Sequence, residues 1–376
     1  MKNTKRILLL CLCLVLAVSL LTGCKKKEEP TIDESFDYSR DLDANGMWKD
    51  IKALDIVTLP DDYAAIKMAR AKVEPSESEL EAEIDEILKS YEYTVDVTER
   101  AAGLYDTVDI DFEGRLADGT TVDGMSGNKS DLVLGSGYMI PGFEDAIVDA
   151  KAFAGDEFEI KVTFPDPYES NTDLSGKDAV FKIKVNAVSE SIIPELTDAF
   201  VAEKYYESEG LMTVAEFKDA LTDAMTEENF LAAIRDHVID DSVYGEIPGK
   251  MMTFQQDANY YYYMLLAQSY ATNYAAYGMS AQDWFEYLTY CTDKESFDEM
   301  NEDIYTDACK ESLVMQAIAE KENITVTDDE VAEYFQANLN VDDYSEYTDY
   351  YGEGYIKMIV RNEKTLAWLY ENASMQ

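Results

Sequence analysis

Three segments between Gly103 and Glu190 alternate apolar and polar residues, and this pattern constrains the fold more than any other feature of the chain. Alternation with a period of two is typical of a strand with one buried face. The apolar residues of the three segments are Val108, Ile110 and Phe112; Phe158, Ile160, Val162 and Phe164; and Phe181, Ile183 and Val185. The segments therefore predict a half-wrapped antiparallel sheet.

A short helix is predicted between the first and second of these strands. The chain turns at Pro141 and Gly142, and Phe143, Ile147 and Ala150 then lie three to four positions apart, which places them on one face of a helix. A helix laid across a twisted sheet leaves a shallow apolar pocket where the two meet. We therefore predict a domain of the α+β class over residues 101–190.

The order of these elements and three local motifs resemble the FKBP fold of peptidyl-prolyl isomerases, and in particular the FKBP domain of trigger factor. The motifs are Val-Asp-Ile-Asp-Phe-Glu-Gly at 108–114, Ile-Pro-Gly-Phe-Glu at 140–144 and Ala-Val-Phe-Lys-Ile-Lys-Val at 179–185. The resemblance implies a peptidyl-prolyl cis-trans isomerase with no metal, organic cofactor or ATP site. Such an enzyme lowers the barrier of roughly 18–20 kcal/mol to X-Pro rotation by preferring the twisted amide to the planar one.

Matching the chain to the family's pocket residue by residue implies seven catalytic-site residues. They are Phe112 on the first strand, Asp123 in the strand after the turn at Asp118-Gly119, Met139, Ile140, Phe143, Tyr168 in the flap loop and Phe181 on the last strand. The resemblance implies that the Ile140 amide holds a substrate carbonyl, that Phe143 forms the aromatic floor and that Phe181 closes the pocket. For each aromatic residue, a plain core role is the alternative.

Two positions depart from the family's pattern. Val122 stands where the family usually has an aromatic residue before the acid. The flap reads Pro-Asp-Pro-Tyr-Glu at 165–169, which leaves the placement of Tyr168 open by a residue or two. Both departures favour the alternative of a degenerate isomerase domain.

Residues 1–23 are predicted to be a lipoprotein signal peptide. They begin with basic residues, continue with an apolar run at 7–21 that is too short to span a membrane, and end in Leu-Thr-Gly-Cys at 21–24. This resembles the lipobox of bacterial lipoproteins, which implies cleavage before Cys24 and lipidation of its thiol by acyl chains such as palmitate. Two or three acyl chains would anchor the protein stably to the outer side of the cell membrane. The alternative is an ordinary cleaved signal with a chance cysteine.

Residues 24–50 are predicted to be a flexible acidic tether because few of them are apolar. Within this segment, Asp41-x-Asp43-x-Asn45-Gly46 begins like an EF-hand loop. Lys49 and Lys52 stand at positions nine and twelve of that loop, where calcium ligands are needed. We therefore do not expect a calcium site.

Residues 51–100 resemble the connector that precedes the isomerase domain in trigger factor. Pro75-Ser76-Glu77-Ser78 is a plausible helix start, and the apolar face of the predicted helix is Leu80, Ile84, Ile87, Leu88 and Tyr91. Trigger factor carries a ribosome-docking domain ahead of this connector, whereas only the predicted tether precedes it here. We therefore expect that this protein does not bind ribosomes.

Residues 191–376 are predicted to be helical. Capping boxes begin at Thr213, Ser280 and Thr327, and a helix predicted from about 252 to 274 carries four consecutive tyrosines at 260–263. Motifs at 194–200, 278–283 and 317–330 resemble the all-α C-terminal chaperone domain of trigger factor. Four consecutive residues face all sides of a helix, so packing within the domain and a client-binding surface are both open interpretations of the tyrosines.

Charge and residue counts exclude several classes of function. The formal net charge of −46 argues against nucleic-acid binding, which depends on Lys and Arg. His237 is the only histidine, so the chain has no Cys/His cluster for zinc and no catalytic-looking nucleophile pair. For Cys291 and Cys309, a buried free thiol is the simpler interpretation, although a disulfide is permitted outside the cytoplasm.

We therefore expect a lipid-anchored, extracytoplasmic relative of trigger factor, an isomerase and folding chaperone for unfolded or nascent secreted polypeptides with X-Pro bonds. The main alternative is a non-catalytic holding chaperone with a degenerate FKBP module. A third class, the lipid-anchored solute receptor, would need two α/β lobes with parallel strands, and the sequence has no strand-helix-strand alternation of that kind.

Overall fold

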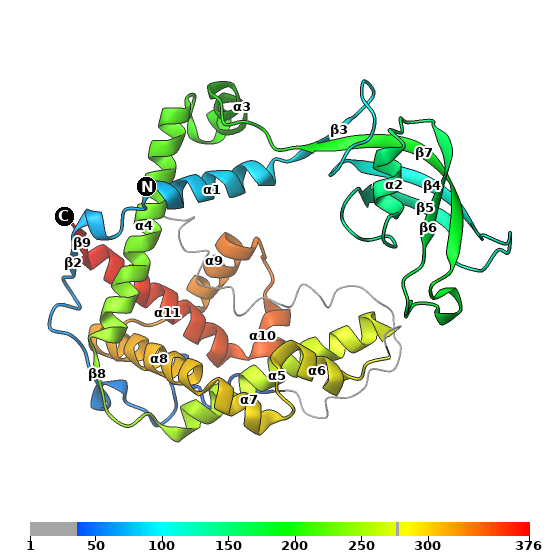
Figure 1. Cartoon of the computed structure of the whole chain (residues 1–376). Helices are drawn as coiled ribbons and strands as arrows, with labels where there is room; N and C mark the ends of the chain where they lie inside the picture. The colour runs from blue at the N-terminus through cyan, green and yellow to red at the C-terminus, as the bar shows by residue number, and fades with distance from the viewer. Residues whose placement is uncertain (1–35, 276–277) are drawn as a thin grey trace. The chain divides into compact units, whose positions relative to one another are not determined.

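The computed structural model describes residues 36–275 and 278–376 (Figure 1). The described chain divides into two compact units. One unit, here called the helical unit, contains the described residues from 36 to 75 and those from 221 to 376, and the other contains Ser76–Ala220. Within the described ranges, we find no helix whose length and hydropathy would let it cross a bilayer.

The unit formed by Ser76–Ala220 contains a five-stranded antiparallel sheet. Its strand order is β3-β7-β4-β5, and β6 pairs with β7 as well. The strands are β3 (Tyr93–Asp96), β4 (Thr107–Leu116), β5 (Ser126–Val133), β6 (Glu157–Thr163) and β7 (Asp178–Ile192). The three strands predicted from alternation are β4, β6 and β7, so the prediction of an antiparallel sheet is confirmed.

One face of this sheet is buried by α2 (Phe143–Asp149), as Figure 1 shows. Phe143 and Ile147 of α2 are fully buried, and so are Ile110 of β4 and Ile183 of β7. The side chains at the alternate positions of β4 and β7 are mostly charged or polar and are half-buried or exposed. The alternating pattern thus separates a core face from a solvent face, as predicted.

The rest of this unit is helical. The predicted helix start is confirmed, because α1 (Glu77–Ser90) begins with a capping box formed by Ser76 and Glu79. At the other end of α1, the Tyr91 ring lies 5.3 Å from the ring of Phe200 in α3 (Asp198–Glu209). A short 3-10 helix, η6 (Thr172–Leu174), lies between β6 and β7.

The helical unit has an all-α body with short strands beside it. Its helices are α4 (Val214–Asp240), which begins in the other unit, α5 (Gly249–Asn273), α6 (Ala281–Thr289), α7 (Lys294–Met300), α8 (Glu302–Glu322), α9 (Asp328–Leu339), α10 (Ser345–Tyr351) and α11 (Glu353–Asn372). The short elements are η4 (Ala53–Asp55), η5 (Arg70–Lys72) and two strand pairs, β1 (Val57–Thr58) with β8 (Val243–Tyr244) and β2 (Lys67–Met68) with β9 (Ser374–Met375). The three predicted capping boxes are present at the starts of α4, α6 and α9.

The predicted flexible tether is wrong for residues 36–50, which pack into the helical unit. Leu42 and Trp48 are 3% and 2% exposed and belong to the core of that unit. The indole Nε1–H of Trp48 donates to Ser312 Oγ at 2.8 Å, and the Trp48 amide donates to Gln316 Oε1 at 2.9 Å. A few large side chains are enough to order this segment, because α8 supplies an apolar surface with polar partners. Residues 24–35 of the predicted tether, the signal peptide and Cys24 lie outside the described residues.

The sequence that resembles an EF-hand start is a structural turn. The Asp43 carboxylate accepts hydrogen bonds from the amides of Asn45 and Met47, at 2.8 and 2.9 Å. The buried guanidinium of Arg361 in α11 donates to the carbonyl of Gly46. Among residues 36–275 and 278–376, no group of three or more His, Cys, Asp and Glu side chains is arranged to hold a metal ion.

Most of the consecutive tyrosines in α5 pack against other elements. The ring of Tyr260 lies 5.4 Å from Phe285 of α6, and that of Tyr263 lies 5.3 Å from Phe297 of α7. Tyr261 lies 5.9 Å from Phe36. These contacts favour the interpretation that the tyrosines pack within the domain. Cys291 and Cys309 are buried free thiols.

Candidate active site

Three of the predicted site residues bring their aromatic rings together where α2 meets the sheet. Phe112 lies on β4, Phe143 opens α2 and Phe181 lies on β7. The ring centroid of Phe143 is 6.1 Å from that of Phe112 and 5.3 Å from that of Phe181. The ring centroids of Phe112 and Phe181 are 6.3 Å apart. Phe143 and Phe181 are buried, and Phe112 is half-buried. We call these three residues the aromatic triad.

Two glycines make room for the aromatic triad. A Cβ atom on Gly114 of β4 would lie 2.5 Å from a ring carbon of Phe181, so only glycine allows this ring to lie against the strand. A Cβ atom on Gly127 of β5 would lie 3.3 Å from the ring of Phe112. At the start of α2, Gly142 has a φ of 83°, a left-handed conformation that glycine adopts without strain.

The flap loop adds a fourth and a fifth ring. The ring of Tyr168 is half-buried and lies 5.1 Å from Phe164, which in turn lies 6.4 Å from Phe181. The Tyr168 amide donates to Ser175 Oγ at 2.9 Å, which helps to hold the loop. Tyr168 thus reaches the aromatic triad through Phe164, which sequence analysis treated only as a strand residue.

Met139 and Ile140 precede the turn into α2 and are both half-buried against the same core. Within the described loop, the amides of residues 134 to 139 each donate a hydrogen bond. The next amide along the described loop, that of Ile140, has no hydrogen-bond partner. Whether it binds a substrate carbonyl, as the sequence resemblance implies, stays a prediction.

Glu144 is the buried charge beside this loop, and sequence analysis gave it no role. Its side chain accepts hydrogen bonds from the amides of Gly135, Gly137 and Met139, at 2.8, 3.0 and 2.9 Å. Burial raises the pKa of the Glu144 carboxyl, but the hydrogen bonds from these three amides lower it, and the net shift is downward. Glu144 is therefore held as a carboxylate. The sequence feature that could have identified Glu144 is its position directly after Phe143, the predicted aromatic floor.

Asp123 is an exposed residue, unlike the buried or half-buried rings of the aromatic triad. It lies in a turn three residues before β5 begins, and not in a strand, so that part of the prediction is wrong. Its side chain is exposed, and the described residues give it no hydrogen bond or ion pair. Its neighbour Val122 is half-buried and packs on the domain core. The chain between β4 and β5 is a long turn, so alternation could not place Asp123.

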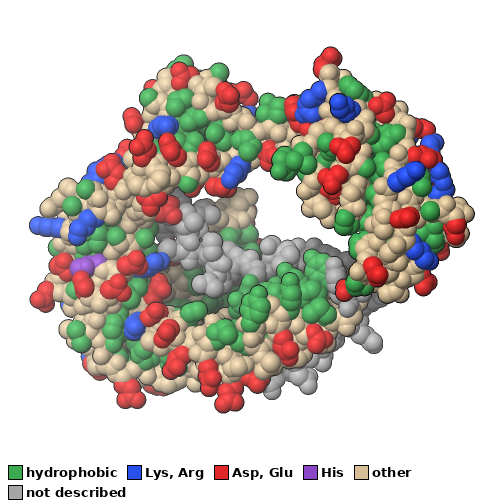
Figure 2. All heavy atoms as spheres, viewed as in Figure 1, with side chains coloured by type: hydrophobic (Ala, Val, Ile, Leu, Met, Phe, Trp, Pro, Cys, Tyr) green, Lys and Arg blue, Asp and Glu red, His purple; other side chains and the backbone are tan. Residues whose placement is uncertain are grey.

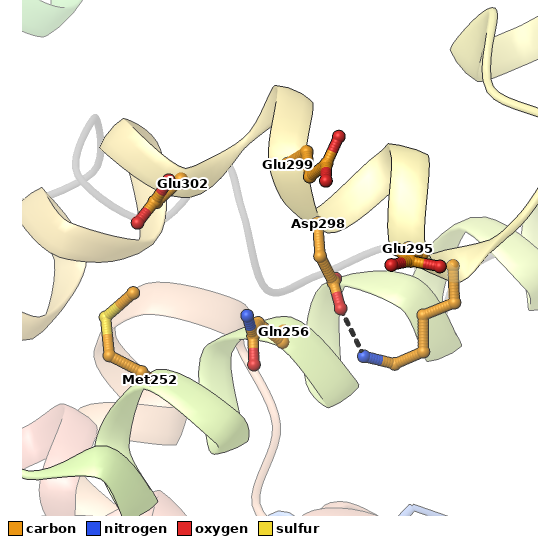
Figure 3. Close-up of a pocket in the computed structure, with 7 residues that line it drawn as sticks. Met252, Gln256, Glu295, Asp298, Glu299 and Glu302 are labelled. Atoms are coloured by element: carbon orange, nitrogen blue, oxygen red, sulfur yellow. Dashed lines mark hydrogen bonds and ion pairs between the residues drawn. The ribbon is translucent and has the colours of Figure 1, made fainter.

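A separate hollow lies in the helical unit, between α5 and α7 (Figure 3). Its volume is about 570 Å³, and it is lined by Met252, Gln256, Lys294, Glu295, Asp298, Glu299 and Glu302. Lys294 Nζ donates to Asp298 at 2.6 Å and pairs with Asp257. This lining is acidic and contains no aromatic ring, so it does not fit an X-Pro segment. The candidate active site is the aromatic triad with the half-buried residues that pack beside it.

Comparison with known proteins assigns both halves of the chain. The family model described as FKBP-type peptidyl-prolyl cis-trans isomerase matches residues 98–186, and that of the bacterial trigger factor protein C-terminus matches residues 213–371. Trigger factor of Caldicellulosiruptor saccharolyticus is 31% identical over 327 residues, which cover 84% of this chain and 70% of that protein. This chain belongs to the trigger factor family.

Other members of the trigger factor family are similarly related. Trigger factor of Halothermothrix orenii is 30% identical over 276 residues, which cover 72% of this chain. The chain spans about 60% of the length of that relative. A solved structure of the trigger factor chaperone matches 84% of this chain and 72% of the chain in that structure, with 18% sequence identity and a TM-score of 0.36. The predicted FKBP and trigger factor C-terminal domains are thus both confirmed.

Proposed function

We propose that this member of the trigger factor family is a peptidyl-prolyl cis-trans isomerase and folding chaperone for secreted or surface proteins. We further propose that it acts outside the cytoplasmic membrane, to which a lipid on Cys24 anchors it. The observation that carries the isomerase proposal is the aromatic triad beside the free amide of Ile140.

The pocket favours X-Pro rotation without an acid, a base or a nucleophile. A planar amide is stabilised by resonance that separates charge, and the apolar rings of Phe112, Phe143 and Phe181 stabilise that form less than water does. In this proposal, the Ile140 amide holds a substrate carbonyl while the bond turns. The apolar surroundings thus lower the free energy of the twisted amide relative to the planar one, which is the requirement for catalysis, and the hydrogen bond from Ile140 serves to orient the substrate.

The chaperone function is proposed for the helical unit. Several large apolar side chains of this unit are exposed, including Tyr287, Tyr290, Met300 and Ile304. Tyrosine and methionine provide adaptable apolar contact area, which suits binding of unfolded chains of varied sequence. Figure 2 shows acidic side chains spread over the surface, in keeping with the net charge of −46. Such a charge opposes self-association of a protein with exposed apolar residues.

Isomerisation of a short X-Pro peptide by the full chain, purified in mild detergent, tests the enzyme. We expect catalysis by the wild type and a loss of at least tenfold in kcat/KM for Phe143→Ala. We expect the same loss for Phe112→Leu, which replaces the half-buried ring with an aliphatic side chain. The control is Phe153→Ala, which removes an exposed ring from the same domain. Thermal unfolding of each variant separates lost catalysis from lost folding. An inactive wild type would refute the isomerase proposal.

The second candidate function is a holding chaperone with an inactive isomerase domain. The exposed position of Asp123 and the valine at 122 favour it, because Asp123 is on the surface and position 122 lacks the aromatic ring that the family usually has there. This candidate predicts that the wild type suppresses aggregation of an unfolded client but does not accelerate X-Pro isomerisation. The same peptide assay, run beside an aggregation assay, decides between the two.

The lipid anchor is tested by Cys24→Ala. The proposal expects this variant to lose acyl labelling with palmitate and to leave the membrane fraction. Cys13→Ala, in the apolar run of the same leader, is the matched control and should remain anchored. Membrane association that survives Cys24→Ala without acylation would refute the anchor.

A further inference from the structure

The loop before α2 is organised around the carboxylate of Glu144. Its Oε2 accepts from the amides of Gly135 and Gly137, and its Oε1 accepts from the amide of Met139. The Glu144 side chain is 6% exposed, so water contributes little to its solvation. The three amides alternate along the loop, and each one faces inward toward the carboxylate. The carboxylate therefore holds the loop in one conformation over five residues.

Ile140 is fixed on both sides by this arrangement. On its N-terminal side, the amide of Met139 is bonded to Glu144 Oε1. On its C-terminal side, the carbonyl of Ile140 accepts from the amide of Phe143 at 3.1 Å. The Ile140 amide itself is free in the described loop, beside the aromatic triad. Its direction is thus set by bonds that its neighbours make.

We propose that Glu144 is a positioning residue for X-Pro isomerisation, because its carboxylate keeps the Ile140 amide directed toward the substrate. This inference rests on the proposed isomerase function. Glu144 does not touch the substrate in this account. It acts through the loop, since a preorganised donor loses less entropy on binding the substrate carbonyl than a mobile one.

The requirement is for a carboxylate and not merely for a polar side chain of this size. A carboxylate accepts through both oxygens, whereas the amide of glutamine has one acceptor oxygen and one donor nitrogen. In Glu144→Gln, either the Met139 amide or the pair of glycine amides would face an N–H group. The side chain keeps its volume, but one side of the loop loses its partner and is left with a buried unsatisfied donor.

The test compares the wild type, Glu144→Gln and Asp145→Asn in the full chain. Asp145 is the exposed carboxylate next to Glu144 on α2, so its variant is matched in charge. We expect kcat/KM to fall about tenfold in Glu144→Gln, equivalent to about 1.4 kcal/mol, and to stay within twofold in Asp145→Asn. Far-UV and near-UV circular dichroism check that each variant is folded. A folded Glu144→Gln variant with wild-type kcat/KM would overturn the proposal.

The pH profile of the wild type gives a readout that a purely structural role would not move. Protonated Glu144 has the same donor and acceptor pattern as glutamine, so kcat/KM should fall on acidification while the protein is still folded. Because the pKa of Glu144 is lowered, this fall should come below the ordinary glutamate pKa of about 4.3. A fall in kcat/KM on acidification that is equally large in a folded Glu144→Gln variant would overturn the proposal, because that variant has no carboxyl group at this position to titrate. An inactive wild type would instead refute the proposed function, and the role of Glu144 with it.

Discussion

The buried carboxyl groups of this protein are stabilised in different ways. Asp106 is paired with the guanidinium of Arg100 and also accepts from the amide of Gly103. The Glu144 carboxylate accepts hydrogen bonds from backbone amides and, at longer distance, from the hydroxyl of Ser136. Glu363 is half-buried, and among the described residues no hydrogen bond or ion pair supports its carboxylate; burial raises its pKa to about 7. These differences lead to opposite dependences of stability on pH.

Glu363→Gln should stabilise the helical unit above neutral pH. The folded pKa of about 7 lies above the ordinary value near 4.3, so the contribution of Glu363 to stability is greatest below pH 4 and is lost as pH rises through 7. We expect a gain of about 1–3 kcal/mol in the free energy of unfolding at pH 8 and little change at pH 5. Chemical denaturation at both pH values measures it. The exposed Glu333→Gln on α9 is the control, and an equal effect at both pH values would contradict the assignment.

Asp106→Asn should destabilise the unit of residues 76–220 and make its stability less sensitive to acid. The hydrogen bonds from Arg100 lower the pKa of Asp106 although burial raises it. Its contribution is therefore present above the unfolded pKa near 4 and is lost as pH falls through the lower folded value. We expect a loss of about 2 kcal/mol at pH 7 and a smaller loss at pH 3 by denaturant titration. Asp111→Asn, exposed on the same strand, should have little effect.

Among the elements, the segment from Phe36 to Trp48 connects distant parts of the helical unit. It carries no regular helix or strand, yet its side chains enter two clusters of that unit. Tyr38 lies 5.1 Å from Tyr351 and from Tyr355, at the junction of α10 and α11. Trp48 lies 5.2 Å from Phe254 of α5. The segment therefore joins helices that are distant in sequence.

Trp48→Ala should destabilise the helical unit by about 3–5 kcal/mol, because it leaves a large cavity and removes the donor to Ser312. Trp48→Phe keeps most of the volume and loses only the Nε1–H bond, so a loss of about 1 kcal/mol is expected. Lys52→Ala, which removes an exposed ion pair with Asp55, serves as control. If Trp48→Ala had the same free energy of unfolding as the wild type, the segment would be flexible, as its composition predicts.

At the scale of the whole molecule, the chain forms two units with separate cores. Residues 76–220 contain the sheet core, and the remaining described residues contain the cores of the helical unit. The helical unit is discontinuous, because the sheet unit is inserted between Pro75 and Leu221. Folding of the helical unit thus needs contacts across an insertion of more than a hundred residues.

We expect calorimetry to resolve two unfolding transitions, because each core can melt without the other. Asp106→Asn should lower the midpoint temperature of only the transition that belongs to the unit of residues 76–220. Trp48→Ala should lower that of only the helical unit. A single transition that both variants shift equally would contradict independent units.

Local chemistry in the sequence determined the elements and part of the site. Alternation along residues 108–112 and 181–185 identified the core face of the sheet, because side-chain direction in a strand depends only on position. Capping boxes such as Ser280 with Asp283 identified helix starts, since both partners lie within four residues. The family resemblance then selected Phe112, Phe143 and Phe181, which the structure brings together.

Only the tertiary structure decided the features whose partners are distant or irregular. Trp48 and Ser312 are 264 positions apart, so no local pattern could predict their bond or the order of the N-terminal segment. The bonds of Glu144 depend on the path of a glycine-containing loop, and the position of Asp123 depends on a long turn; neither has a period. Sequence periodicity reports which way a side chain points within an element, whereas burial and hydrogen-bond partners depend on what the folded chain places opposite it.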